Sequence, residues 1–256
     1  MAVYVVADLH GAPDALAKAV PEGATLVLLG DLINFLDYNT MSGILTEVFS
    51  RAAVEEVMDL RGRGDLDGAR RAMRRRAEGR ESEIRAEIAG RVGEQYRAIF
   101  AALPDPTYLI LGNVDQPQVV ASFVDGAPGV HAPDAEVVRI GGERFGFVGG
   151  ALPTPLNVAG EISHEEMSAK VAGLGECDIL CSHIPPAVPE LCYDTRAGHA
   201  EDGSTDLLAY IQDVQPARHY FGHVHQPLLS SLRIGRTLCV NVGYFRATGR
   251  AFPHRS

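Results

Sequence analysis

Five short, largely apolar segments constrain the fold of this chain more than any other feature of its sequence. They lie at residues 3–7, 25–29, 107–111, 178–181 and 218–221. Apolar runs of this length are typical of strands that are buried on both faces, as in parallel sheets covered by helices. We therefore expect an α/β protein whose central strands run parallel.

Polar residues follow each of these segments at once, where the strand should end. They are Asp8, His10, Asp31, Asn113, His183, His223 and His225. Taken singly, an aspartate or a histidine after a strand is more often a cap or a loop residue than a ligand. In open α/β sheets, however, ligand sites form at the carboxyl ends of the strands. One sheet edge would bring all seven together, and the pattern therefore predicts a metal site.

Two further segments read as β-hairpins. The segment 136–148 turns at Gly141-Gly142, and the segment 228–240 turns near Gly235. Such turns favour antiparallel pairs. Hairpins together with buried parallel strands predict two mixed sheets packed on each other, with helices outside.

The middle of the chain has helical spacing of apolar residues and no strand pattern. We expect a helical insertion at about 37–103. Within it, residues 61–80 are rich in arginine and glycine and have almost no apolar stripe. A charged, solvated helical pair is the plainest interpretation. A dimerisation arm, which would make a homodimer, and a substrate lid are the alternatives.

Charge and cysteine content limit the partners and the location. The formal net charge of −10 argues against a basic face for nucleic acid, but it does not exclude a nucleic-acid substrate. No uncharged stretch approaches the ~20 residues that a membrane span needs. The four cysteines form no C-x-x-C pair, and no signal core is found. We expect a cytoplasmic protein with reduced, buried thiols.

The order of the polar residues resembles that of the calcineurin-like metallophosphoesterases. The motifs are D-x-H at Asp8 and His10, G-D at Asp31, G-N at Asn113, a lone histidine at His183, and G-H-x-H at His223 and His225. The sequence around His183 and His223 is also similar to a small-phosphodiesterase branch of that family. The resemblance covers both ends of the chain and leaves out the insertion. It implies a four-layer α/β/β/α sandwich, with residues 1–256 as a single domain.

The resemblance also implies how two divalent metal ions would be held. Asp31 would bridge the ions. The set for one ion would be completed by Asp8, His10 and His225, and the set for the other by Asn113, His183 and His223. Such mixed ligands suit Mn, Fe, Zn, Co or Ni better than Ca or Mg. Two close divalent cations neutralise a phosphate ester and lower the pKa of a bound water. The expected reaction is phosphoester hydrolysis by a metal-bridging hydroxide, with Asp31 and Asn113 as catalytic residues.

One position departs from the family pattern. The family motif usually continues G-N-H-[DE], but this chain reads Gly112-Asn113-Val114-Asp115. Valine cannot protonate a leaving group, and some phosphodiesterases of the family also lack this histidine. His199, in a loop that follows His183, is the candidate for a replacement proton donor. A solvated loop residue is the alternative for His199.

We therefore expect a dimetal phosphodiesterase that acts on a small phosphodiester, such as a cyclic or open nucleotide. A nuclease, a phosphomonoesterase or protein phosphatase, and a non-catalytic metal-binding scaffold are the alternatives. A nuclease would favour a basic groove, and a protein phosphatase would favour the full G-N-H motif. A scaffold usually loses metal ligands, and none of the seven is missing here.

Overall fold

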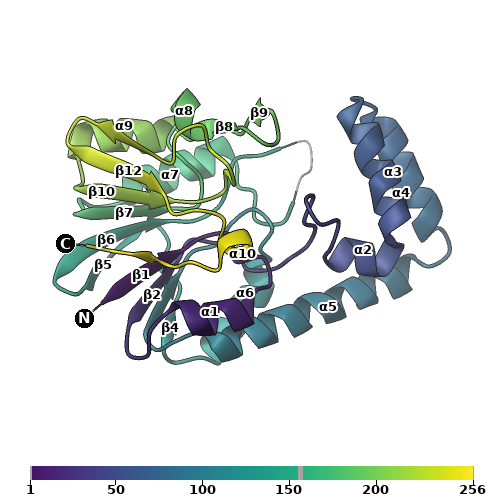
Figure 1. Cartoon of the computed structure of the whole chain (residues 1–256), viewed down its shortest axis with the longest axis horizontal. Helices are drawn as coiled ribbons and strands as arrows, with labels where there is room; N and C mark the ends of the chain where they lie inside the picture. The colour runs from purple at the N-terminus through teal and green to yellow at the C-terminus, as the bar shows by residue number, and fades with distance from the viewer. Residues whose placement is uncertain (1, 155–157, 256) are drawn as a thin grey trace. The chain divides into compact units, whose positions relative to one another are not determined.

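The five apolar segments form neighbouring strands of two mixed β-sheets (Figure 1). The structure is a computed structural model that describes residues 2–154 and 158–255. The five-stranded sheet has the order β13 (Phe252–Pro253), β1 (Val3–Val6), β2 (Thr25–Leu28), β3 (Thr107–Leu109) and β4 (Val130–His131). Strands β1 to β4 run parallel, and β13 is antiparallel to β1.

The six-stranded sheet contains both predicted hairpins. Its order is β11 (Ser231–Ile234), β12 (Thr237–Asn241), β10 (Arg218–Phe221), β7 (Ile179–Ser182), β6 (Glu143–Val148) and β5 (Glu136–Ile140). The pairs β5–β6 and β11–β12 are antiparallel, which confirms the two hairpins. The four strands between the edges are parallel. A separate small ribbon pairs β8 (Tyr193–Asp194) with β9 (His199–Ala200).

The two large sheets pack face to face and are covered by helices. Side chains of both sheets share one apolar cluster, in which Val5 and Val27 of one sheet join Phe145 and Tyr220 of the other. The outer face of the six-stranded sheet packs on α7 (His164–Gly173) and α9 (Thr205–Val214). Helices α1 (Pro13–Ala19) and α6 (Pro117–Asp125) lie on the far side of the five-stranded sheet (Figure 1). The predicted α/β/β/α sandwich is confirmed.

Strand register aligns the ends of the neighbouring strands. Val6 pairs with Leu28 across β1 and β2, so the loops that follow begin side by side. Tyr220 pairs with Cys181 across β10 and β7, which brings Gly222 level with His183 and His223 next to it. Two short helices, α8 (Pro189–Cys192) and α10 (Phe245–Thr248), follow β7 and β12 in the chain. The topology therefore places the polar strand ends at a common edge.

The chain divides into two compact units, residues 1–32 with 99–256, and residues 33–98. The second unit overlaps the region where we predicted an insertion at about 37–103, and it begins four residues and ends five residues earlier. It consists of α2 (Ile44–Phe49), α3 (Arg51–Gly62), α4 (Leu66–Ala77) and most of α5 (Glu81–Ala102).

Helix α4 packs better than its sequence led us to expect. Its residues Ala69 and Ala72 are buried against Val57 of α3, with Leu60 and Met73 at the edge of the same cluster. Our expectation of almost no apolar stripe in residues 61–80 is wrong. Small side chains allow two helices to approach closely, and alanine contributes apolar contact without standing out as a hydrophobic run.

Candidate metal centre

Four predicted ligand residues have a left-handed backbone. The φ angles are 54° for Asp8, 41° for His10, 53° for Asp31 and 66° for His223. This region is uncommon for residues other than glycine, and such strain clusters at functional sites. The left-handed residues turn the chain sharply past each strand end.

Hydrogen bonds tie these turns together. The Asp8 amide donates to the Gly30 carbonyl at 3.2 Å, and the His10 amide donates to the Asp31 carbonyl at 2.9 Å. The Asp8 carboxylate in turn accepts from the His223 amide, at 3.1 and 3.0 Å. Two loops of the five-stranded sheet and one of the six-stranded sheet are thereby joined.

The glycines of the G-D, G-N and G-H motifs are required by this close approach. A Cβ atom on Gly30 would collide with the backbone of Gly112. One on Gly112 would meet the Asp31 carboxylate, and one on Gly222 would meet Ala7 and the Asp8 carboxylate. Only glycine leaves room for the neighbouring backbone at Gly30 and for the carboxylates at Gly112 and Gly222.

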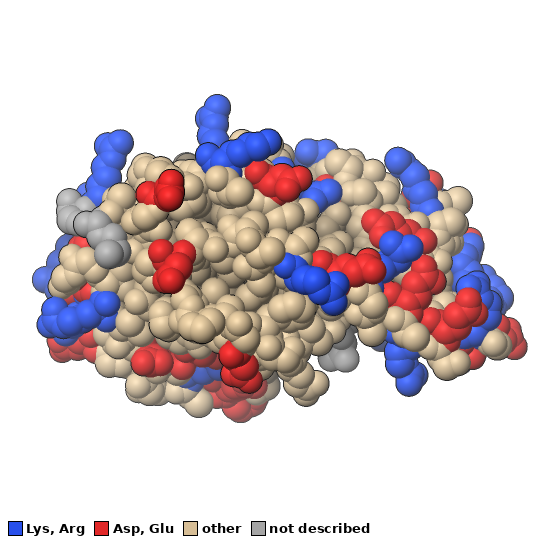
Figure 2. Space-filling view, turned by 90° about the horizontal axis from the view of Figure 1, so that it is seen from below, with Lys and Arg blue, Asp and Glu red and all other residues tan. Residues whose placement is uncertain are grey.

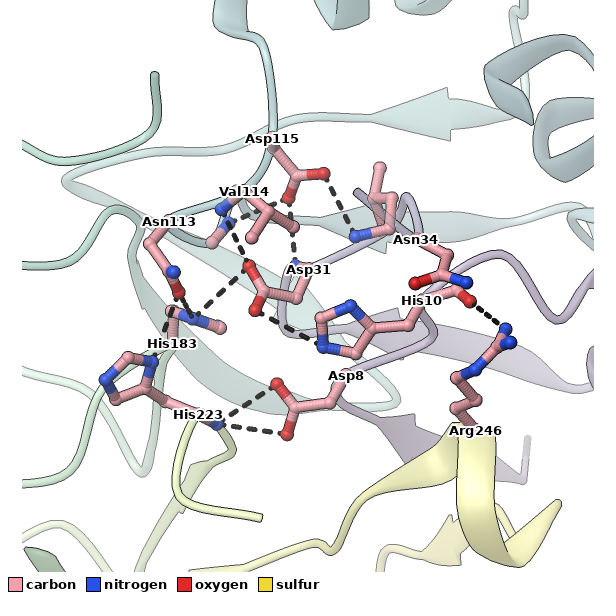
Figure 3. A network of polar contacts seen from close by, with 12 residues as sticks. Asp8, His10, Asp31, Asn34, Asn113, Val114, Asp115, His183, His223 and Arg246 are labelled. Carbon is pink, nitrogen blue, oxygen red and sulfur yellow. Dashed lines mark hydrogen bonds and ion pairs between the residues drawn. The ribbon is translucent and has the colours of Figure 1, made fainter. Parts of the chain in front are cut away.

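Ligand atoms of the predicted residues converge in two overlapping groups. Asp8, His10 and His225 place one ligand atom each within 4.8 Å of one another, and so do Asp8, Asp31 and His183. The two oxygens of Asp31 face different histidines (Figure 3). Oδ2 lies 3.5 Å from Nε2 of His10, and Oδ1 lies 3.6 Å from Nε2 of His183.

Asn113 joins the second of these groups. Its Oδ1 lies 3.0 Å from Nε2 of His183 and 3.2 Å from Nδ1 of His223 (Figure 3). The structure therefore brings all seven predicted residues into one cluster: Asp8, His10, Asp31, Asn113, His183, His223 and His225.

Burial makes the carboxyl groups of this cluster hard to ionise. It raises the pKa of Asp31 to about 7. Burial, and then the charge of Asp31, raise the pKa of Asp115 to about 7 and that of Asp8 well above its usual range. Buried carboxylates that repel one another are stabilised by a cation placed among them.

Burial keeps His183 and His223 neutral, and a hydrogen bond orients the ring of His183. Burial lowers the pKa of His183 to about 4, and burial followed by the charge of His183 lowers the pKa of His223 well below its usual range. Nδ1 of His183 donates to the Leu29 carbonyl at 2.8 Å, so Nε2 presents a lone pair. That lone pair faces oxygens of Asn113 and Asp31. Electron-rich atoms turned toward one another in this way fit a bound metal ion.

Asp115 supports the site through the backbone. Its carboxylate accepts from the amides of Asp31, Leu32 and Gly112, at 2.9, 3.0 and 2.9 Å. Asp115 therefore fixes the G-D and G-N loops. The Val114 amide donates to Asp31 Oδ1 at 3.1 Å. The side chain of Val114 is apolar and adds no polar group to the site.

His199 lies outside the cluster but is linked to it. Its side chain is 62% exposed and pairs with Glu201 at 3.1 Å. The other carboxylate oxygen of Glu201 lies 4.0 Å from Nε2 of His223. Sequence reasoning missed Glu201, because an acidic loop residue carries no distinguishing local signal.

Two other residues that the sequence did not single out contact predicted ligands. The ring of Tyr244 stacks on His225, and the guanidinium of Arg246 donates to the His10 carbonyl. Tyr244 precedes the short helix α10 and Arg246 lies within it, in a part of the sequence with no motif that we recognised. Only their proximity in the folded chain reveals them.

Comparison with known proteins identifies the class to which this fold and cluster belong. The calcineurin-like phosphoesterase family matches residues 1–227, so the chain belongs to that family. It is thus a metal-dependent phosphoester hydrolase of a family that uses a dimetal centre, with Asp8, His10, Asp31 and His183 among its candidate ligands. No curated protein matches the chain.

Solved structures agree with the fold. One crystal structure matches with a TM-score of 0.58 at 16% identity, covering 100% of this chain and 99% of its own. A protein of unknown function from Aquifex aeolicus matches with a TM-score of 0.43 at 13% identity, covering 98% and 95%. A protein assigned as a 5'-nucleotidase from Staphylococcus aureus, in complex with alpha-ketoglutarate, has a TM-score of 0.45 at 14% identity, covering 94% of this chain and 48% of its own. Because the last two scores are below 0.5, only the first bears on the fold.

Among the described residues, none of the helices combines the length and the apolar character that crossing a bilayer demands.

Proposed function

We propose that this protein hydrolyses a small phosphodiester, with a nucleotide diester as the first candidate. The observation that carries the proposal is the convergence of seven ligand residues on one edge of the sandwich. We assign Asp8, His10 and His225 to one ion, Asn113, His183 and His223 to the other, and Asp31 to both. The assignment of Asp31 to both ions is supported by its two carboxylate oxygens, one of which faces His10 and the other His183.

When bound, two divalent transition-metal ions, with manganese our first candidate, supply charge neutralisation and an acidified water. The residues of the chain orient the ligand atoms and keep the imidazoles neutral. Asp31 and Asn113 would take part in the reaction through their side-chain oxygens, which point into the cluster.

The diester preference rests on the resemblance to a small-phosphodiesterase branch of the family and on Val114, because some phosphodiesterases of the family also lack a histidine at this position. A proton donor at that position would help an alkoxide leave, and such donors typically accelerate reactions ~10²–10⁴-fold. Without one, good leaving groups are favoured. We assign the missing role to His199, supported by its link through Glu201 to His223.

A screen of metals against substrates tests the proposal. Metal-free protein would be loaded with Mn²⁺, Fe²⁺, Zn²⁺, Co²⁺ or Ni²⁺ and assayed on aryl phosphodiesters, cyclic nucleotides, phosphomonoesters and single-stranded DNA. We expect the highest kcat/KM on a diester. Preference for a monoester or for DNA would favour the phosphatase or the nuclease instead, and inactivity with two ions bound would favour a scaffold.

Location and assembly are further parts of the proposal. The four cysteines are free and buried, which supports a reducing, cytoplasmic environment. A homodimer through the helical unit remains our proposal for assembly.

Arginines and acidic residues are interspersed on the surface in Figure 2, which shows one face of the molecule. That face has no uniformly basic area, in keeping with a small substrate.

A further inference from the structure

The segment from Gly243 to Arg246 runs beside the first ligand loop. Tyr244 pairs with Ala7 as a parallel bridge. The Phe245 amide donates to the Ala7 carbonyl and the Arg246 amide to the Asp8 carbonyl, both at 3.2 Å. This segment lies beyond residue 227, where the family match ends.

Tyr244 contacts two of the assigned ligands at once. Its ring is parallel to that of His225, with centroids 3.9 Å apart and 2° between the planes. The ring of His10 meets it edge-on, with centroids 5.6 Å apart and planes at 80°. His10 also meets His225 edge-on at 5.3 Å. Tyr244 is only 7% exposed, so neighbouring atoms hold its ring in place.

Arg246 contacts the backbone of the same ligand loop. Its guanidinium donates to the carbonyl of His10, a residue with a left-handed φ of 41° (Figure 3). A carbonyl anchored in this way resists relaxation of the loop toward an ordinary conformation.

We infer that Tyr244 is a positioning residue for the metal ion assigned to Asp8, His10 and His225. An imidazole can bind a metal ion only when its lone pair points at the ion, and a stacked ring restricts its rotation. Outer residues that orient ligands typically change metal affinity by ~10–100-fold. The inference rests on the proposed two-ion site, and it adds that the C-terminal segment tunes one ion more than the other.

Titration of metal-free protein with Co²⁺, followed by calorimetry and visible absorption, tests this inference. Wild type should bind two ions. Tyr244→Phe, which keeps the ring, should match wild type within ~3-fold. Tyr244→Leu should weaken one ion by ~10–100-fold and leave the other within ~3-fold. Equal weakening of both ions, no weakening, or the same loss in Tyr244→Phe would overturn the inference.

Double variants identify the ion that is affected. Because coupled residues are non-additive, Tyr244→Leu should add little in a His225→Ala background. It should keep its full effect in an Asn113→Ala background. The reverse pattern would contradict the assignment. Circular dichroism of each metal-free variant checks the fold.

A second route is available if Tyr244→Leu does not fold. Arg246→Gln should weaken the same ion, whereas Arg250→Gln, at an exposed arginine four residues further along the chain, should not. Equal behaviour of these two variants would overturn the inference. A wild-type protein that binds fewer than two ions would instead refute the proposed function itself, and this separates the two failures.

Discussion

At the scale of single residues, the site combines strained backbone conformations with buried ionisable side chains. Left-handed, non-glycine residues cost about 1–3 kcal/mol each and persist only where surrounding contacts hold them. Here the contacts are the Asp115 carboxylate and the hydrogen bonds between loops. Burial raises the pKa of Asp8 and Asp31, and a bound cation would stabilise their ionised forms, so single substitutions should be read out in metal content as well as in rate.

Asp31→Ala should remove most activity and much of the bound metal, because one carboxylate is assigned to both ions. Transition-state stabilisation by a metal ion is worth several kcal/mol, so kcat/KM should fall at least ~100-fold. Elemental analysis and steady-state kinetics measure the two effects. Asp14→Ala, an exposed aspartate, is the control. Full metal content and activity in Asp31→Ala would refute the assignment.

His199→Ala should slow hydrolysis of an alkyl diester far more than that of an aryl diester, by ~10²-fold or more against little change. The reason is that an alkoxide needs a proton and a nitrophenolate does not. Glu201→Gln should act in the same direction, because Glu201 holds His199. His164→Ala, an exposed histidine in α7, serves as the control. Equal effects on both substrates would reduce His199 to a binding or structural residue.

At the scale of elements, the helical unit has its own small core. Helices α3 and α4 bury Val57, Ala69 and Ala72 together, and Arg76 pairs with Glu56 across them. That pair is partly exposed and contributes little on its own. The apolar contact between α3 and α4 therefore stabilises this helix pair. Loss of the contact should have only local effects, because residues 33–98 form a compact unit of their own.

Ala72→Glu should loosen α3 and α4 and leave both metal ions bound. The substitution places a charge where the native side chain has no exposed surface, which is costly without a partner. Hydrogen exchange should rise by at least ~10-fold across residues 51–77, while metal stoichiometry stays at the wild-type value. Ala52→Glu, at an exposed position of α3, is the matched control. Loss of metal in Ala72→Glu would show that the helical unit supports the site.

At the scale of the whole molecule, metal binding and protonation are linked. The pKa of Asp31 is about 7 in the metal-free protein because of burial. Below pH 7 the carboxyl is largely protonated, and a metal ion must displace the proton. Above pH 7 the Asp31 carboxyl is largely ionised and has no proton to lose. His183, with a pKa of about 4, is already neutral at pH 6 and adds no proton.

Metal affinity should therefore fall by ~10-fold per pH unit for each proton displaced as the pH decreases from 7 to 5. Asp8, whose pKa is also raised, should steepen the fall. Calorimetry at pH 6 in two buffers of different ionisation enthalpy should show release of at least one proton. A pH-independent affinity, with no proton released, would contradict the raised pKa of Asp31.

Local sequence pattern determined much of the fold and most of the site. Residues 3–7 and 25–29 are apolar over a whole strand, and that signal depends only on neighbours in the chain. The ligands Asp31 and Asn113 could be found because each stands two residues after the apolar segment 25–29 or 107–111 and because the motif glycines precede them. The Gly141-Gly142 turn predicted its hairpin for the same reason.

Only the tertiary structure brought Tyr244 and Arg246 to His10, or Glu201 to His223. These contacts join residues far apart in the chain, and no local periodicity encodes them. Helix α4 shows the same limit on a smaller scale, because alanine becomes a core residue only when another helix approaches it. Local order follows from the periodicity of side chains along the backbone. The outer shell of the site follows from the way β1, β7, β10 and the C-terminal segment pack, which depends on the whole chain at once.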